Sequence, residues 1–174
     1  FGLVYRGAFQ GHGAVITPHN IHIGWPAITE GGIQVNKNGL RFSNENQGYS
    51  EQALNVVKQL DHVAWTVWDQ RCEDVATQMH SHQEATKANA IKKFNNVTEL
   101  AGYIGCNTEK LQETLRCVER SCLGDFQDNY GRDFTKKPPL KPPYYVAKIQ
   151  GALFHTQGGL EVDRSARVLR EDGQ

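Results

Sequence analysis

The sequence lacks the short motifs that mark the commonest nucleotide and nucleophile sites. It contains no Gly-x-Gly-x-x-Gly between a strand and a helix, no phosphate loop ending in Gly-Lys-Ser/Thr, and no Gly-x-Ser-x-Gly turn. Such motifs hold a dinucleotide, a nucleotide phosphate or a serine nucleophile, respectively. No dinucleotide can therefore be placed on this chain from a local motif.

The chain also has no excess of charge and no long apolar run. Its 19 Lys and Arg residues balance its 19 Asp and Glu residues, so electrostatics give no argument for a nucleic acid or an anionic membrane. No apolar run approaches the ~20 residues that span a bilayer. The length of 174 residues, 39% of them hydrophobic, suits one domain with one modest core. We expect neither a nucleic-acid partner nor a membrane partner.

Metal-binding patterns are scarce as well. None of the four cysteines belongs to a Cys-x-x-Cys pair; they are Cys72, Cys106, Cys117 and Cys122. A disulfide framework or a zinc site stays open, but this spacing favours buried or incidental thiols in a reducing, cytoplasmic setting. His19 and His22 would share a metal only on a helix, and the neighbouring Pro18 and Ile21 favour an extended chain. We expect no metal site.

Strand patterns gather towards the two ends of the chain. Ile21–Trp25 and Gly32–Asn36 alternate as strands do, and Asn36–Gly39 predicts a tight turn that leads into a strand at Leu40–Phe42. Near the other end, Tyr144–Ile149 is predicted to be a strand. It is followed by Ala152–His155, by a turn at Gly158-Gly159, and by two short strands at Leu160–Asp163 and Arg167–Leu169.

Helical patterns occupy the middle. Ser50–Leu60 is predicted to be a helix with Ser50 as its N-cap, followed by a half-buried strand at His62–Trp68. Two further helices are predicted over Asn96–Ile104, closed by Gly105, and over Glu109–Glu119, capped by Asn107. The polar stretch Arg71–Ala90 indicates helix and loop, with His80 and His82 solvated. Strands at both ends with helices between them predict an α+β fold.

The two ends read as cuts through a longer sequence. Phe1 opens directly on a strand-like segment, and Glu171–Gln174 is a turn signal with no element after it. We therefore expect the chain to be an internal segment excised from a larger protein.

Four segments, in order, resemble the capping domain of the fumarate reductase and succinate dehydrogenase flavoprotein family. They are Phe9–His12, Thr29–Phe42, Pro143–Lys148 and Phe154–Asp163. The resemblance implies that residues 1–174 form a domain that interrupts the FAD domain, closes over the flavin and traps substrate. It also implies that the last ~15 residues begin the return to the FAD domain.

The resemblance implies roles for residues on both sides of a trapped substrate. His12 is similar to a histidine that holds a substrate carboxylate, while Thr29 and Glu30 resemble a Thr-Glu pair whose glutamate delivers a proton. A second set matches the segment that faces the flavin, and it consists of His155, Thr156, Gly158 and Gly159.

Three departures from the family pattern bear on the substrate. Tyr49 stands where fumarate-reducing members carry an arginine acid, Phe154 replaces a second carboxylate-binding histidine, and a relay arginine after Glu30 is absent. Losing two donors costs a dicarboxylate roughly a few kcal/mol for each unpaired charged oxygen. The pattern therefore argues against fumarate or succinate and favours a more apolar substrate. Tyr49 becomes the candidate acid or base, with Arg41 either a nearby cation or part of a structural ion pair.

The resemblance thus implies an FAD-dependent oxidoreductase that acts on a C–C bond of an organic acid or a related apolar substrate. This segment would be inactive alone and would not bind FAD, since its partner is the FAD domain of the same chain. Exposed surface meant for that domain leaves open a homodimer of the isolated segment. The alternative is an independent α+β binding module with no redox role.

Overall fold

One long strand organises the molecule. The computed structural model describes the backbone of residues 5–17, 19–170 and 172, and the side chains of this set outside 5–16 and 153–159. Strand β5 (Tyr144–Leu160) pairs along one edge with β3 (Val63–Asp69) and along the other with β4 (Ile91–Phe94) and β1 (Tyr5–Ile16). Strand β2 (Ile33–Val35) pairs with β3, and every pairing is antiparallel.

Helices cover both faces of this sheet. One face carries α1 (Pro26–Thr29), α2 (Tyr49–Val57), α3 (Gln70–Ala76) and α4 (His80–Lys87). The other face carries α5 (Val97–Ile104) and α6 (Thr108–Leu123). Two short 3-10 turns, η1 (Glu45–Gln47) and η2 (Leu60–His62), flank α2. The result is an α+β body, as the order of sequence patterns predicted.

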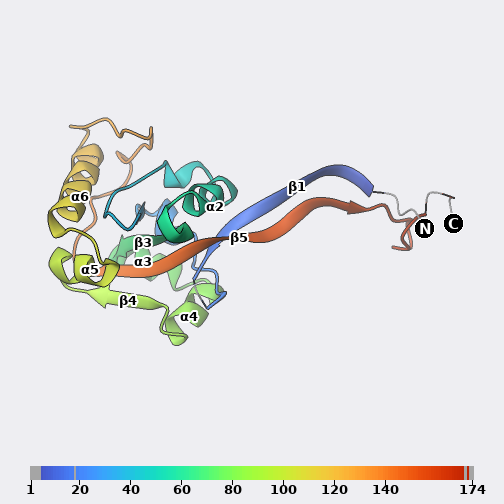
Figure 1. Cartoon of the computed structure of the whole chain (residues 1–174), viewed down its shortest axis with the longest axis horizontal. Coiled ribbons are helices and arrows are strands. Elements are labelled where there is room, and N and C mark those ends of the chain that lie inside the picture. The colour runs from blue at the N-terminus through green and yellow to red at the C-terminus, as the bar shows by residue number, and fades with distance from the viewer. Residues whose placement is uncertain (1–4, 18, 171, 173–174) are drawn as a thin grey trace.

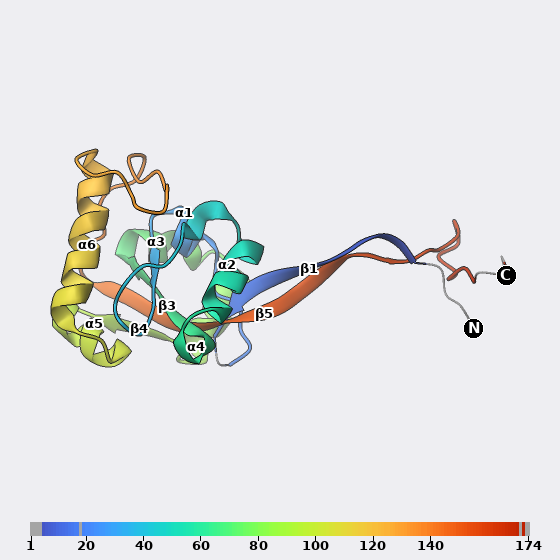
Figure 2. The same ribbon diagram turned by 45° about the horizontal axis from the view of Figure 1, so that its top comes forward.

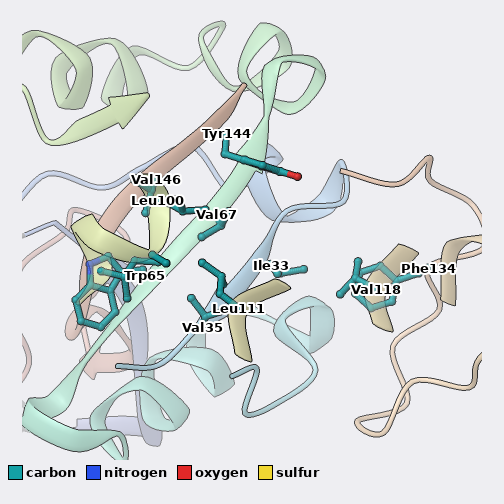
Figure 3. Close-up of a cluster of buried hydrophobic side chains, with 12 residues drawn as sticks. Ile33, Val35, Trp65, Val67, Leu100, Leu111, Val118, Phe134, Tyr144 and Val146 are labelled. Atoms are coloured by element: carbon teal, nitrogen blue, oxygen red, sulfur yellow. The ribbon is translucent and has the colours of Figure 1, made fainter. Parts of the chain in front are cut away.

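The central strand β3 is buried on both faces. Ala64 and Trp68 pack towards α1–α4, whereas Trp65 and Val67 pack towards α5 and α6. Figure 3 shows the second of these clusters, in which residues from β2, β3, β5 and α6 converge. The prediction of a half-buried strand was therefore wrong, because a strand between two helical layers buries both sets of side chains.

A two-stranded ribbon projects from this body (Figures 1 and 2). Beyond Gln150, the only strand that pairs with β5 among the described residues is β1, in a register that runs out to Tyr5 opposite Leu160. At the base of the ribbon, α2 crosses β5 at Gly151. A Cβ built there would lie 2.6 Å from the carbonyl oxygen of Ala53 and 2.5 Å from Cγ2 of Val57. Glycine is thus required for α2 to approach the ribbon this closely.

Several predicted elements differ from the structure. Neither Leu40–Phe42 nor Ile21–Trp25 forms a strand. The turn at Asn36–Gly39 does form, with Gly39 N–H donating to the Asn36 carbonyl at 2.9 Å, but β2 pairs with β3 instead of with the residues after the turn. The N-cap of α2 is Gly48, two residues before the predicted Ser50.

The two helices predicted from their caps are confirmed. The side chains of Asn96 and Asn107 cap α5 and α6, and Gly105 ends α5 in the left-handed conformation that glycine adopts without strain. Past the ribbon, Val162 and Val168 form an isolated antiparallel bridge in place of the two predicted short strands. Within the part of the chain that the structure describes, each helix is too short or too polar to cross a bilayer.

Candidate functional site

The ribbon brings together the site residues predicted at opposite ends of the chain. His12 on β1 pairs with His155 on β5, and Gly11 pairs with Thr156. The register shifts just after His12, since Gly13 pairs with Leu153, and this leaves Phe154 as an extra residue in β5. A bulge of this kind bends the strand and changes the direction of its side chains, and bulges are common beside active sites. The side chains of these residues lie outside the described set.

The glycine pair does not form the predicted turn. Gly158 and Gly159 lie inside β5, and Gly159 pairs with Arg6. The turn prediction failed because the partner strand lies at the other end of the sequence, where no local pattern could reveal it. The pairing with β1 continues past both glycines, with a register shift between Arg6 and Gln10 opposite Gly158.

Glu30 caps the C-terminal end of α1. Its carboxylate accepts a hydrogen bond from Lys137 Nζ at 2.7 Å, and its backbone carbonyl accepts one from Arg71. Thr29, the last residue of α1, is exposed. The turn after α1 needs Gly32, because a Cβ there would lie 2.1 Å from the Ala27 carbonyl oxygen. Glu30 is thus held by two cationic side chains from distant segments.

Tyr49 lies at the other end of α1. It is the first residue of α2, and its ring meets that of Trp25 edge-on with centroids 6.2 Å apart. Trp25 is the residue before α1, whereas Glu30 follows it. The two predicted catalytic groups therefore sit at opposite ends of one short helix. Tyr49 is 37% exposed, so its ring remains reachable from outside the body.

Arg41 belongs to a buried ion-pair network, which decides between its two predicted roles. It donates to Glu45 from Nε at 2.7 Å and from Nη2 at 2.8 Å, and it also pairs with Asp128. Arg132 donates to the same glutamate at 3.0 Å. Burial opposes ionisation of Glu45, but the hydrogen bonds and charge of Arg41 and the charge of Arg132 outweigh it and lower the pKa of the carboxyl. Arg41 is structural.

Sequence patterns missed several polar residues that hold the site region together. Lys137 and Arg132 come from the connection between α6 and β5, which reads as a plain polar loop. Arg132 also donates to the carbonyls of Ile28 and Gly32 at 2.8 Å each, which satisfies the end of α1. No local signal marks these contacts, because each joins residues about a hundred positions apart.

The remaining candidates for special chemistry are structural. All four cysteines are free thiols, and burial raises the pKa of Cys72 to about 12. His82, predicted to be solvated, is fully buried: its Nε2 lies 3.0 Å from Glu73, and its Nδ1 accepts the backbone N–H of Gly24. Within the described residues, no group of three His, Cys, Asp or Glu side chains is placed to hold a metal.

FAD, the cofactor implied by the sequence resemblance, does not fit the described residues as a complete ligand. Dinucleotides are held where a parallel strand turns into a helix N-terminus across a glycine-rich loop. Every strand pairing here is antiparallel. The ribbon places His12, which was predicted to bind substrate, opposite His155, which was predicted to face the cofactor. The described residues supply at most one wall of such a site.

Comparison with known proteins adds a family assignment. The family model described as "FAD binding domain" matches residues 12–174. An NADH:fumarate oxidoreductase of Klebsiella pneumoniae is 25% identical over 174 residues, which cover 99% of this chain and 18% of that protein. A 3-oxosteroid 1-dehydrogenase of Mycobacterium tuberculosis is 28% identical over 185 residues, covering 86% of this chain and 33% of that protein.

A solved structure shares the fold. The open conformation of a flavocytochrome c3 fumarate reductase superposes with a TM-score of 0.77 at 24% identity, covering 99% of this chain and 30% of that one. The chain therefore spans about a third or less of the length of these relatives.

Proposed function

Because this chain belongs to the FAD binding domain family, whose relatives here include fumarate reductase and 3-oxosteroid dehydrogenase types, we propose that it is the substrate-covering domain of an FAD-dependent oxidoreductase. FAD is the cofactor of the longer protein, and its substrate lies between the flavin and this domain. The reaction is the reduction or dehydrogenation of a C–C bond. This chain alone is inactive, since it supplies one wall of the site.

The observation that carries this proposal is the projecting ribbon. Two paired strands are marginally stable in water unless another surface covers them. Beyond Gln150, no third strand among the described residues pairs with β5 (Figure 2). The ribbon also holds His12, His155 and Thr156 in one stretch of the register. A surface that covers the ribbon would therefore meet the residues predicted to face flavin and substrate.

We assign this chain two tasks in the reaction, orientation of the substrate and transfer of one proton. His12 binds a carboxylate or carbonyl oxygen of the substrate. Tyr49 exchanges a proton with one carbon of the reacting C–C bond, next to the carbon that exchanges the hydride. The packing of Tyr49 against Trp25 supports this role, because an aromatic neighbour fixes the ring while its edge stays exposed. Glu30, paired with Lys137, contributes negative charge at the far end of α1.

The substrate is proposed to be more apolar than a short diacid. Phe154 and Tyr49 replace two donors that a dicarboxylate needs, and a buried charged oxygen without a donor is costly. A ring or chain bearing a single carbonyl or carboxylate matches the remaining set. Such a molecule presents one oxygen to His12 and apolar surface to the rest of the site.

The test uses the longer flavoprotein and its Tyr49→Phe variant. We expect the purified protein to show the flavin absorbance bands, and the variant to keep them while its turnover of α,β-unsaturated ketones or acids falls about a hundredfold. Turnover is followed with an artificial electron-carrying dye. Loss of a proton donor lowers kcat and leaves flavin content unchanged.

The matched control is Tyr130→Phe, since Tyr130 is similarly exposed (42%) but donates its hydroxyl hydrogen bond to the Arg41 carbonyl. That variant should turn over like the wild type. A longer protein that is colourless and takes up no FAD would refute the oxidoreductase proposal and favour a binding module. Unchanged turnover in Tyr49→Phe would remove only the tyrosine from the mechanism.

A further inference from the structure

A basic hollow lies on the body beside the C-terminal end of α5, and none of the residues assigned to the proposed active site lines it. It has a volume of about 310 Å³ and is lined by His19, Asn89, Lys92, Tyr103 and Lys148, among others. Among the residues that the structure describes, no aspartate or glutamate lines it. Its walls come from the segment after β1, the turn after α4, the strands β4 and β5, and α5. Five separate parts of the fold thus converge on one space.

The two lysines of this hollow share one face of the sheet. Lys92 pairs with Val146 across β4 and β5, and Lys148 lies two residues further along β5. Residues in this diagonal relation point to the same side, about 7–8 Å apart, with their Cβ atoms somewhat closer. The cation–π contact between Lys148 Nζ and the ring of Trp65, 6.0 Å from its centroid, fixes that side chain on the same face. Both ammonium groups can reach a single small ligand.

Nearby groups leave the positive charge of the hollow uncompensated. Among the described residues, neither Lys92 nor Lys148 has an ion-pair partner within 4.0 Å. Asp61 feels the charge of Lys148, but its carboxylate pairs with Lys37 at 2.8 Å.

At the end of α4, which borders the hollow, three backbone carbonyls are already engaged. The carbonyls of Glu84, Ala85 and Thr86 already accept backbone N–H groups at 2.9–3.0 Å. Each polar side chain of the printed lining can donate a hydrogen bond: the two ammonium groups only donate, whereas the imidazole, the amide and the phenol can also accept. Such a set is matched to an oxyanion.

We propose that this hollow binds an oxyanion of the phosphate class, held between Lys92 and Lys148, with Tyr103 and Asn89 donating to its remaining oxygens. The volume admits a phosphate group together with a small organic group attached to it. The proposal does not depend on the redox function, because none of these residues belongs to the proposed active site.

The experiment is a titration of the ¹⁵N-labelled chain followed by two-dimensional NMR, with inorganic phosphate, glycerol phosphate, acetate and chloride at matched ionic strength. We expect saturable shifts confined to the amides of residues 88–92 and 148 with the two phosphates, at dissociation constants of about 1–10 mM. Glycerol phosphate binding more tightly than inorganic phosphate identifies a phosphomonoester as the ligand. Equal affinities identify free phosphate.

Three variants make the test specific. Lys92→Gln and Lys148→Gln should each weaken phosphate binding about fivefold, the effect of one unit charge at contact distance in water, and Lys148→Arg should restore it. Lys93→Gln is the control, since Lys93 stands on the opposite face, 5.0 Å from the ring centroid of Tyr145. The site is refuted if phosphate shifts are no larger than those of chloride, if acetate binds more tightly, or if Lys93→Gln weakens binding as much as Lys92→Gln.

Discussion

At the scale of single residues, Glu45 is tightly held inside the fold. It is fully buried, and its two oxygens accept hydrogen bonds from Arg41, Arg132 and the backbone N–H of Gln34. A buried ion pair adds little stability compared with well-packed apolar side chains of similar volume. Removing one partner is nevertheless costly, because it leaves a desolvated charge without its counterion. The network therefore fixes the loop before β5 to the segment between β2 and α2.

We predict that Glu45→Gln destabilises the chain by about 3–5 kcal/mol at neutral pH, because two arginines lose their shared anion. Urea unfolding followed by circular dichroism measures the change. The control is Asp61→Asn, which breaks the exposed Lys37–Asp61 pair and should leave the unfolding midpoint nearly unchanged. Equal effects of the two substitutions would contradict a special role for the buried network.

The same residue predicts a pH dependence. The pKa of Glu45 is lowered in the folded chain, so its contribution is present above the ordinary value of 4.5 and is lost as pH falls towards the folded-state pKa. We therefore expect the stability gap between wild type and Glu45→Gln to narrow progressively below pH about 4.5. A gap that stays constant from pH 7 to pH 3 would show that the charge of Glu45 is not what stabilises the fold.

Residue identity alone predicted little of this network. The sequence left Arg41 either as a cation near Tyr49 or as part of a structural ion pair. It could not decide between them, because the partner Asp128 lies far away along the chain. His82 was misjudged for the same reason, since its polar neighbours in the sequence do not show that Glu73 and Gly24 enclose it. Burial of a charged group depends on partners that only the fold supplies.

At the scale of elements, local signals succeeded and distant pairings failed. The helices α5 and α6 were predicted because Asn96, Asn107 and Gly105 fix their ends within a few residues. Strand β4 was missed, and a strand was predicted at Leu40–Phe42, because pairing in this sheet is decided by β3 and β5 far along the chain. For the candidate site, the family resemblance indicated residues that the register of β1 and β5 places together. The spacing of these residues in the sequence could not have indicated them.

The crossing of α2 over the ribbon gives a prediction for an element. We expect Gly151→Ala to destabilise the chain by about 1–3 kcal/mol, because the added methyl group meets the backbone of α2 and forces it to move. Thermal unfolding measures the loss. Gly102→Ala provides a control of opposite sign: it lies inside α5 with nothing within 4 Å of an added Cβ, so a gain of about 0.5–1 kcal/mol is expected. Identical shifts in both variants would refute the crossing.

At the scale of the whole molecule, the ribbon decides how the chain behaves alone. An unpaired strand edge offers backbone donors and acceptors to another chain. We predict that the isolated chain dimerises as its concentration rises from about 10 to several hundred μM, a range typical of weak association. Sedimentation velocity measures the shift. The longer flavoprotein, in which we propose that the ribbon is covered, should show none. A chain that stays monomeric throughout would argue against the ribbon as a contact surface.

The pairing of β1 with β5 also bears on biosynthesis. The first strand leaves the ribosome well before its partner has been translated, since Tyr5 pairs with Leu160. At about 5–20 residues per second, the nascent strand waits roughly 10–30 s. During that interval its backbone is open to chaperones and to misdirected pairing. This part of the sheet is therefore completed only after β5 has been synthesised, and a slow codon tract ahead of β5 would lengthen the most vulnerable stage.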